Sequence, residues 1–89
     1  MYQVIFEKRV QKFLTQHKGQ PIIIQFEKTL QCLIIDPLDS SLDIKSLKWY
    51  EWFYRLRLWK YRFIYEIVDD KLIIDFVNAD SRGDIYKRL

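Results

Sequence analysis

The chain has 89 residues, of which 49% are hydrophobic and 17% aromatic, and its net charge is +3. This content is too apolar for a disordered chain and sufficient for one small core, so a single domain over residues 1–89 is expected. The sequence shows neither the run of about 20 apolar residues that a membrane helix needs nor a signal-peptide pattern, and a cytoplasmic protein without a membrane partner is therefore expected. Cys32 lacks Cys or His partners at metal-ligand spacing, which predicts a structural, partly buried thiol, no metal site and no cofactor.

The first 36 residues predict a strand followed by two helices. Residues 2–6 are a short apolar strand candidate, and Glu7 begins a helical pattern whose apolar stripe is Phe6, Val10, Phe13, Leu14 and His17. Gly19 suits the position past a helix end, and Pro21 suits the first turn of a second helix. The apolar stripe of that second helix is Ile22, Phe26, Leu30 and Leu33. We expect a helical hairpin that ends before Pro37, although three consecutive isoleucines from position 22 are also compatible with the start of a strand.

The next 40 residues predict an antiparallel meander. Residues 38–48 are polar with spaced apolar side chains, so they are interpreted as a loop laid over the core by Leu42, Ile44 and Leu47. Three apolar, aromatic segments follow, at 52–58, 61–68 and 72–77, the last two joined by a tight turn at 69–71. The fold class expected is α+β.

Cations cluster on the first two strands of this meander. Strand alternation places Arg55 and Arg57 on one face, and the opposite face carries Tyr54, Leu56 and Leu58. Arg62 opens the next strand beside this pair. A solvated sheet face is one explanation. The other explanation is a binding site for a polyanion, because arginine binds phosphate bidentately. Clustered arginines repel each other, and the nearest acids in sequence, Glu51 and Glu66, are too few to pair all the cations.

The carboxyl-terminal segment predicts a short helix. Ser81 and Asp84 form a pair like a capping box, which favours a helix start at that point. Arg82 would then lie in the first turn, where the helix dipole disfavours a cation. A charge placed against the dipole indicates a role other than helix stability.

Three stretches together resemble a known protein family. They are D-P-L-D from Asp36, the F-Y-R-L-R…K-Y-R-F-I-Y-E-I block over residues 53–67, and R-G-D-I-Y-K over residues 82–87. Their order and spacing resemble the RelE/ParE superfamily of bacterial toxin-antitoxin toxins over most of the chain. The resemblance implies a strand, a helical hairpin, a three-stranded antiparallel meander and a short C-terminal helix. It also implies an antitoxin that wraps and blocks the toxin and, for the RelE branch, cleavage of mRNA in the ribosomal A site.

The resemblance also implies roles for individual residues. Arg62 resembles the arginine at the start of the second meander strand, Arg82 the terminal phosphate-handling arginine, and Tyr86 the late tyrosine of the RelE branch. Arg55 lies where that branch often has a lysine. The chain departs from the pattern at three positions, where it has Phe53, Lys60 and Ser81.

Metal-independent RNA cleavage is the chemistry that this set favours. A base removes the 2′-hydroxyl proton, the oxygen attacks phosphorus in line, and fixed guanidiniums stabilise the charge on the phosphoryl oxygens; the arginines suited to this are Arg55, Arg62 and Arg82. Arginine keeps its proton and cannot be the base. The base candidates are Tyr86, Asp80 and His17, and further RNA contacts are expected from Arg57, Trp59, Lys60 and Tyr61.

Two other functions remain compatible with the sequence. The ParE branch implies a non-enzymatic inhibitor of DNA gyrase, and the departures at Phe53 and Ser81 favour it, whereas the set Arg62, Arg82 and Tyr86 favours the nuclease. A plain RNA-binding module would need Trp59 or Tyr61 to be exposed for stacking.

Overall fold

The computed structural model describes residues 1–81, so Arg82, Tyr86 and the helix expected after Ser81 lie outside the described residues. In chain order the secondary-structure elements are β1 (Gln3–Phe6), α1 (Lys8–Gln16), α2 (Pro21–Leu33), β2 (Ile44–Ser46), β3 (Phe53–Leu58), β4 (Tyr61–Val68), the short 3₁₀ turn η1 (Asp69–Lys71) and β5 (Ile73–Asp80).

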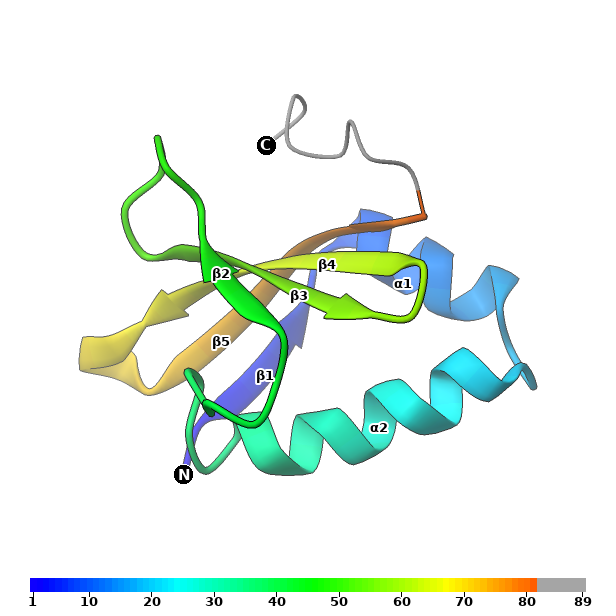
Figure 1. Ribbon diagram of the computed structural model, residues 1–89, viewed down its shortest axis with the longest axis horizontal. Coiled ribbons are helices and arrows are strands. Elements are labelled where there is room, and N and C mark those ends of the chain that lie inside the picture. Colours follow the sequence, from blue (N-terminus) through cyan, green and yellow to red (C-terminus); the bar gives the residue numbers. More distant parts are fainter. Residues whose placement is uncertain (82–89) are drawn as a thin grey trace.

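All five strands form one mixed sheet, with the order β1-β5-β4-β3-β2 (Figure 1). The first strand pairs in parallel with β5, and every other neighbouring pair is antiparallel. The parallel pair is possible because the two helices carry the chain away from the end of β1 before the meander begins. The predicted α+β class, with an amino-terminal strand, a helical hairpin and an antiparallel meander, is confirmed.

Local chemistry sets the ends of the helices. Glu7 has an extended backbone before α1, and the Gln11 side-chain amide donates to the carbonyl of Phe6, 2.8 Å away. Gly19 takes a φ of 82° between the helices, in the left-handed region that favours glycine. Pro21 then occupies the first turn of α2, where its missing N–H costs no helical hydrogen bond.

Both helices pack on the same face of the sheet and bury an aromatic core. The Phe26 ring stacks on Phe63 with 4.4 Å between ring centroids, and Phe76 meets Phe26 edge-on. From α1, Phe13 contacts Phe63, with 5.3 Å between ring centroids. We call the side of the sheet that the helices cover the helix face and the opposite side the open face.

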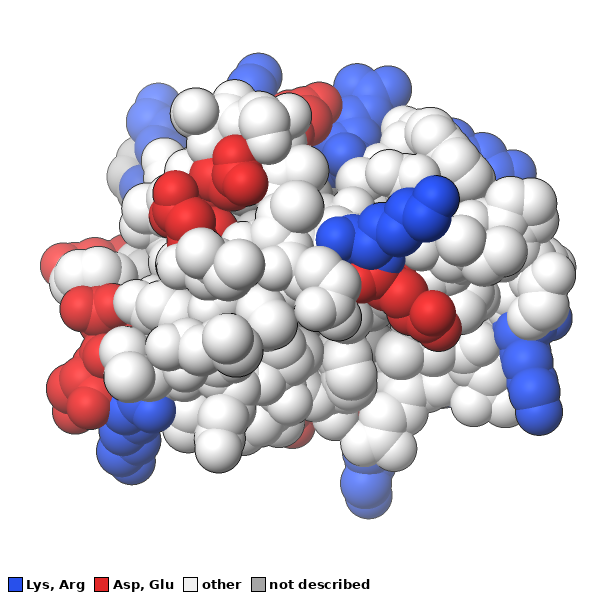
Figure 2. All heavy atoms as spheres, turned by 90° about the horizontal axis from the view of Figure 1, so that it is seen from below, with Lys and Arg blue, Asp and Glu red and all other residues white. Residues whose placement is uncertain are grey.

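Figure 2 views the molecule from the side of α2, where basic side chains are dispersed mainly around the rim.

The predicted tight turn at 69–71 is present, as a 3₁₀ turn closed by Leu72 in the left-handed region, with a φ of 53°. The structure corrects the sequence-based prediction in three places. Part of the predicted loop at 38–48 is strand β2, which pairs with β3, and β5 runs to Asp80 instead of ending at Val77. Cys32 is exposed instead of partly buried, because it lies on the side of α2 away from the core.

Neither helix within residues 1–81 is long and apolar enough to cross a membrane.

Candidate functional site

The open face of the sheet brings the predicted cations together. Arg57 on β3 lies directly across from Arg62 on β4, which in turn lies across from Asp80 on β5. In the next row, Arg55 lies between Lys45 on β2 and Ile64 on β4. Residues paired directly across strands point to the same side. Four cations from three strands therefore share this face, on the side that the helices leave uncovered.

Arg55 differs from the solvent-exposed arginine that its sequence position suggests. Its residue surface is only 8% exposed, and its guanidinium Nη2 donates to Oδ1 of Asp43 at 2.5 Å. The Nε atom is buried, with no acceptor within the described part of the chain. Asp43 was not among the acids considered from the sequence, because only folding brings it next to Arg55. Arg55 is therefore a fixed residue of the cationic face whose charge is partly neutralised by Asp43. Its catalytic role stays a prediction.

Arg57 and Arg62 form the accessible part of the same face. Arg57 is exposed, and its Nε donates to the carbonyl of Trp59 at 3.1 Å, which tethers the side chain along the β3–β4 turn. Arg62 is partly buried. Two guanidiniums on directly paired residues repel each other, and Asp80, across from Arg62, supplies one carboxylate on the same face. A phosphate, which accepts bidentate hydrogen bonds from arginine, would reduce this repulsion further.

The remaining predicted RNA contacts are not all on this face. Trp59 and Lys60 form the β3–β4 turn, where Trp59 is 55% exposed and has a φ of 57°. Tyr61 points to the helix face, where its ring lies edge-on to Phe13. These turn residues line a separate pocket of about 320 Å³ against the start of α2. The structure therefore separates Tyr61 from Arg57 and Arg62, although the three are close in sequence.

Two of the three candidate bases fall within the described residues. Asp80 lies across from Arg62 on the open face. The His17 ring stacks on Phe13 at 4.1 Å, and its Nδ1 lies 2.8 Å from the Phe13 carbonyl, to which it donates. That contact fixes His17 on the helix face, away from the arginine pair. Of these two, only Asp80 shares a face with the guanidiniums.

The open face becomes acidic toward the opposite end of β4. Glu66 lies across from Asp75 on β5. Loss of hydration, a hydrogen bond to Glu7 and the charges of Glu7 and Glu66 raise the pKa of Asp75 to about 6. An extended polyanion is repelled from this end and attracted to the arginine end, so the charge distribution favours its binding at the end of the face that carries Arg57 and Arg62.

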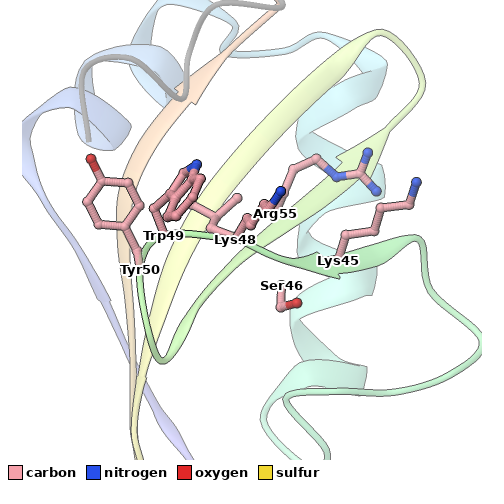
Figure 3. A pocket seen from close by; sticks show the side chains of 7 residues that line it. Lys45, Ser46, Lys48, Trp49, Tyr50 and Arg55 are labelled. Atoms are coloured by element: carbon pink, nitrogen blue, oxygen red, sulfur yellow. The ribbon is translucent and has the colours of Figure 1, made fainter.

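A pocket of about 460 Å³ lies beside Arg55, under the loop between β2 and β3 (Figure 3). Lys45 and Ser46 on β2, Arg55 on β3, and the loop residues Leu47, Lys48, Trp49 and Tyr50 line it. Trp49 is 81% exposed. This pocket was not predicted from the sequence, although the alternation of Leu42 and Ile44 with Asp43 and Lys45 was an available signal for a short strand at this point.

The architecture of the chain, a mixed five-stranded sheet with a parallel β1–β5 pair and both helices on one face, matches that of solved RelE structures. The chain is similar to RelE in the RelE-RelB complex of Pyrococcus horikoshii OT3, with a TM-score of 0.79, 26% identity, and coverage of 92% of this chain and 96% of that chain.

It is also similar to a chain of the RelB-RelE complex of Methanococcus jannaschii, with a TM-score of 0.64, 28% identity, and coverage of 96% and 98%. A third similarity, in fold alone, is to the RelBE complex of E. coli, with a TM-score of 0.77, 20% identity, and coverage of 93% and 99%. No protein-family model and no curated protein sequence matches the chain. The RelE/ParE resemblance stated from the sequence is confirmed at the level of structure.

Proposed function

We propose that this chain is the toxin of a toxin-antitoxin system and acts in the cytoplasm as a ribosome-dependent mRNA endonuclease, working as one domain. The observation that carries the proposal is the pair Arg57 and Arg62, held on adjacent strands of a RelE-like sheet on the face that the helices leave free.

The arrangement supports phosphoryl transfer without a metal. In the proposed reaction the 2′-oxygen of the RNA loses its proton, forms a bond to phosphorus and breaks the bond to the 5′-oxygen, which takes up a proton as it leaves. The products are a 2′,3′-cyclic phosphate and a 5′-hydroxyl. Arg57 and Arg62 would donate to the phosphoryl oxygens as negative charge grows on them, and guanidiniums already held by the sheet need little reorganisation. Asp80, across from Arg62, is the base candidate on this face.

The proposed partner in the resting cell is a cognate antitoxin. The solved relatives from Pyrococcus horikoshii OT3 and Methanococcus jannaschii are complexes of RelE with RelB. A cationic open face accounts for such a partner here, because an acidic segment laid over Arg57 and Arg62 would neutralise them and exclude RNA.

The test is induction of the chain in bacteria, followed by mapping of mRNA 5′ ends. We expect growth arrest, breaks inside translated codons, and no cleavage of naked RNA at the same concentration. Arg62→Ala should lower cleavage by programmed ribosomes about 10²–10³-fold, the usual effect of losing one preorganised donor. Lys28→Ala is the matched control, because it removes one exposed cation from α2 on the helix face, and it should leave cleavage unchanged.

A gyrase inhibitor would give a different pattern. Intact mRNA together with loss of gyrase supercoiling would contradict the nuclease and support the ParE-like alternative. Equal cleavage by Arg62→Ala and the unaltered chain would remove the arginine pair from the reaction.

A further inference from the structure

We propose that the β2–β3 loop is a base-stacking platform, on which one base of the RNA substrate lies against Trp49 while Lys48 and Arg55 hold the adjoining phosphate. The inference rests on the proposed function, since it takes RNA as the substrate, and it adds a positioning residue outside the Arg57–Arg62 pair.

Trp49 presents an indole ring to solvent. It is 81% exposed, and its ring lies 5.2 Å, measured from the centroid, from Nζ of Lys48. An exposed indole leaves its ring available for stacking with a flat ligand. Every nucleobase offers a flat π face of matching shape, and Lys48, already beside the ring, supplies the charge for the phosphate attached to that nucleotide.

The loop that carries Trp49 is held in place by backbone hydrogen bonds. The Leu47 amide donates to the Phe53 carbonyl at 2.9 Å, and the Tyr50 amide donates to the Leu47 carbonyl at 3.2 Å. Trp52, with a φ of 71°, turns the chain back into β3, and its carbonyl accepts from the Ile67 amide of β4 at 2.9 Å. A ring carried by such a loop is preorganised, so binding loses less conformational entropy than it would on a mobile loop.

The pocket below the loop has the volume of a small-molecule site, and its wall is largely apolar with basic side chains among the lining residues. Its volume of about 460 Å³ lies within the range of small-molecule sites. The basic side chains among its lining residues are Lys45, Lys48 and Arg55, and none of the lining residues is acidic. Arg55 is 8% exposed and its Nη2 donates to Asp43, so it contributes a fixed positive charge to one side of the pocket.

The position of the pocket connects it to the proposed reaction. Arg55 and Arg57 are two residues apart on β3 and point to the same face, which places them about 7 Å apart along the strand. A single strand of RNA leaving the pocket along β3 would next meet Arg57 and Arg62. An apolar peptide would use the indole but would offer no anionic group to Lys45 and Lys48, so we assign the site to RNA.

The experiment measures binding of a fluorescent, single-stranded 2′-O-methyl RNA octamer to the full chain at low salt, by anisotropy. The 2′-O-methyl group prevents cleavage and keeps the base and the phosphate. Trp49→Ala should weaken binding about ten- to hundredfold, as expected for one lost aromatic stack. Trp49→Phe should retain most of the affinity. Trp52→Ala is the matched control, because Trp52 is another exposed tryptophan of the same loop that does not line the pocket.

Thermal melts and cleavage by programmed ribosomes complete the test. An unchanged Tm together with a raised Kd in Trp49→Ala supports the platform. This holds even if the unaltered chain does not cleave mRNA and the proposed function is wrong. An unchanged Kd in Trp49→Ala overturns the platform, even if ribosomal cleavage proves the proposed function correct. Equal losses in Trp49→Ala and Trp52→Ala overturn it too. Trp49→Ala that loses the antitoxin but keeps the octamer assigns the pocket to a protein partner and also overturns the proposal.

Discussion

Removal of the Asp43 carboxylate should destabilise the protein through the buried guanidinium that it leaves behind. The side chain of Arg55 is 10% exposed, whereas that of Asp43 is 53% exposed, and their contact measures 2.5 Å. Breaking a fully buried ion pair by removing one partner costs about 3–5 kcal/mol. Because the Asp43 side is half open to water, which can hydrate the remaining charge, we reduce the expected cost of Asp43→Ala to about 1–2 kcal/mol.

That free-energy loss is large enough to measure in a domain of this size. A change of 1 kcal/mol shifts Tm by about 4–8 °C for 60–100 residues, so Asp43→Ala should lower Tm by about 5–15 °C. Asp43→Asn should cost less, because it keeps a hydrogen-bond acceptor and removes only the charge. Arg55→Met should relieve the penalty, since an apolar side chain of similar length needs no counter-ion.

The assay is a double-mutant cycle by thermal and urea unfolding of four chains: the unaltered chain, Asp43→Ala, Arg55→Met and the double variant. We expect Asp43→Ala to be destabilising when Arg55 is present and nearly neutral in the Arg55→Met background, with a coupling of about 1–2 kcal/mol. Equal effects of Asp43→Ala in both backgrounds would refute the reasoning, because the cost would then arise from the loop and not from the ion pair.

Two further predictions concern the sheet. The ring of Tyr65 is fully buried, and its hydroxyl donates to the Pro37 carbonyl at 2.6 Å. Tyr65→Phe leaves that carbonyl without its donor and should lower the free energy of unfolding in urea by about 1–2 kcal/mol. An unchanged unfolding midpoint would show that water replaces the hydroxyl. Burial raises the pKa of Asp75 from 3.8 in the unfolded chain to about 6, so its favourable contribution to stability is present below pH 4 and lost as pH rises through 6. Asp75→Asn should therefore raise Tm at pH 7 more than at pH 4, and an equal shift at both pH values would contradict a titrating Asp75.

Much of the fold could be predicted because its signals are local. The helical stripe through Phe13 and Phe26, and the alternation on both sides of Arg57, follow from the spacing of side chains along a helix or strand. Strand β2 was missed, since it has only three residues, two of them polar, and is defined mainly by its pairing with β3. The predicted partial burial of Cys32 was wrong, although Cys32 is not part of the apolar stripe of α2 and the spacing therefore indicated an exposed side chain.

The candidate site was predictable in part for the same reason. Alternation placed Arg55 and Arg57 together, and the short turn after β3 placed Arg62 beside them. Alternation also places Tyr61 on the face opposite to its neighbour Arg62. The contact of Arg55 with Asp43, twelve residues away in sequence, arises only when distant segments are packed together, so no local pattern contains it.

The place of β5 in the sheet has a consequence for how the protein is made. It is the last strand of residues 1–81, yet it lies between β1 and β4, and it pairs Gln3 with Ile73, seventy positions later. Until a ribosome has synthesised β5, the strands on either side of it each have an open edge and the core lacks Phe76. Contacts of such long sequence separation fold slowly and late. A sheet with this topology therefore reaches its final shape only after β5 has been synthesised, so an activity that needs the complete sheet is absent before that point.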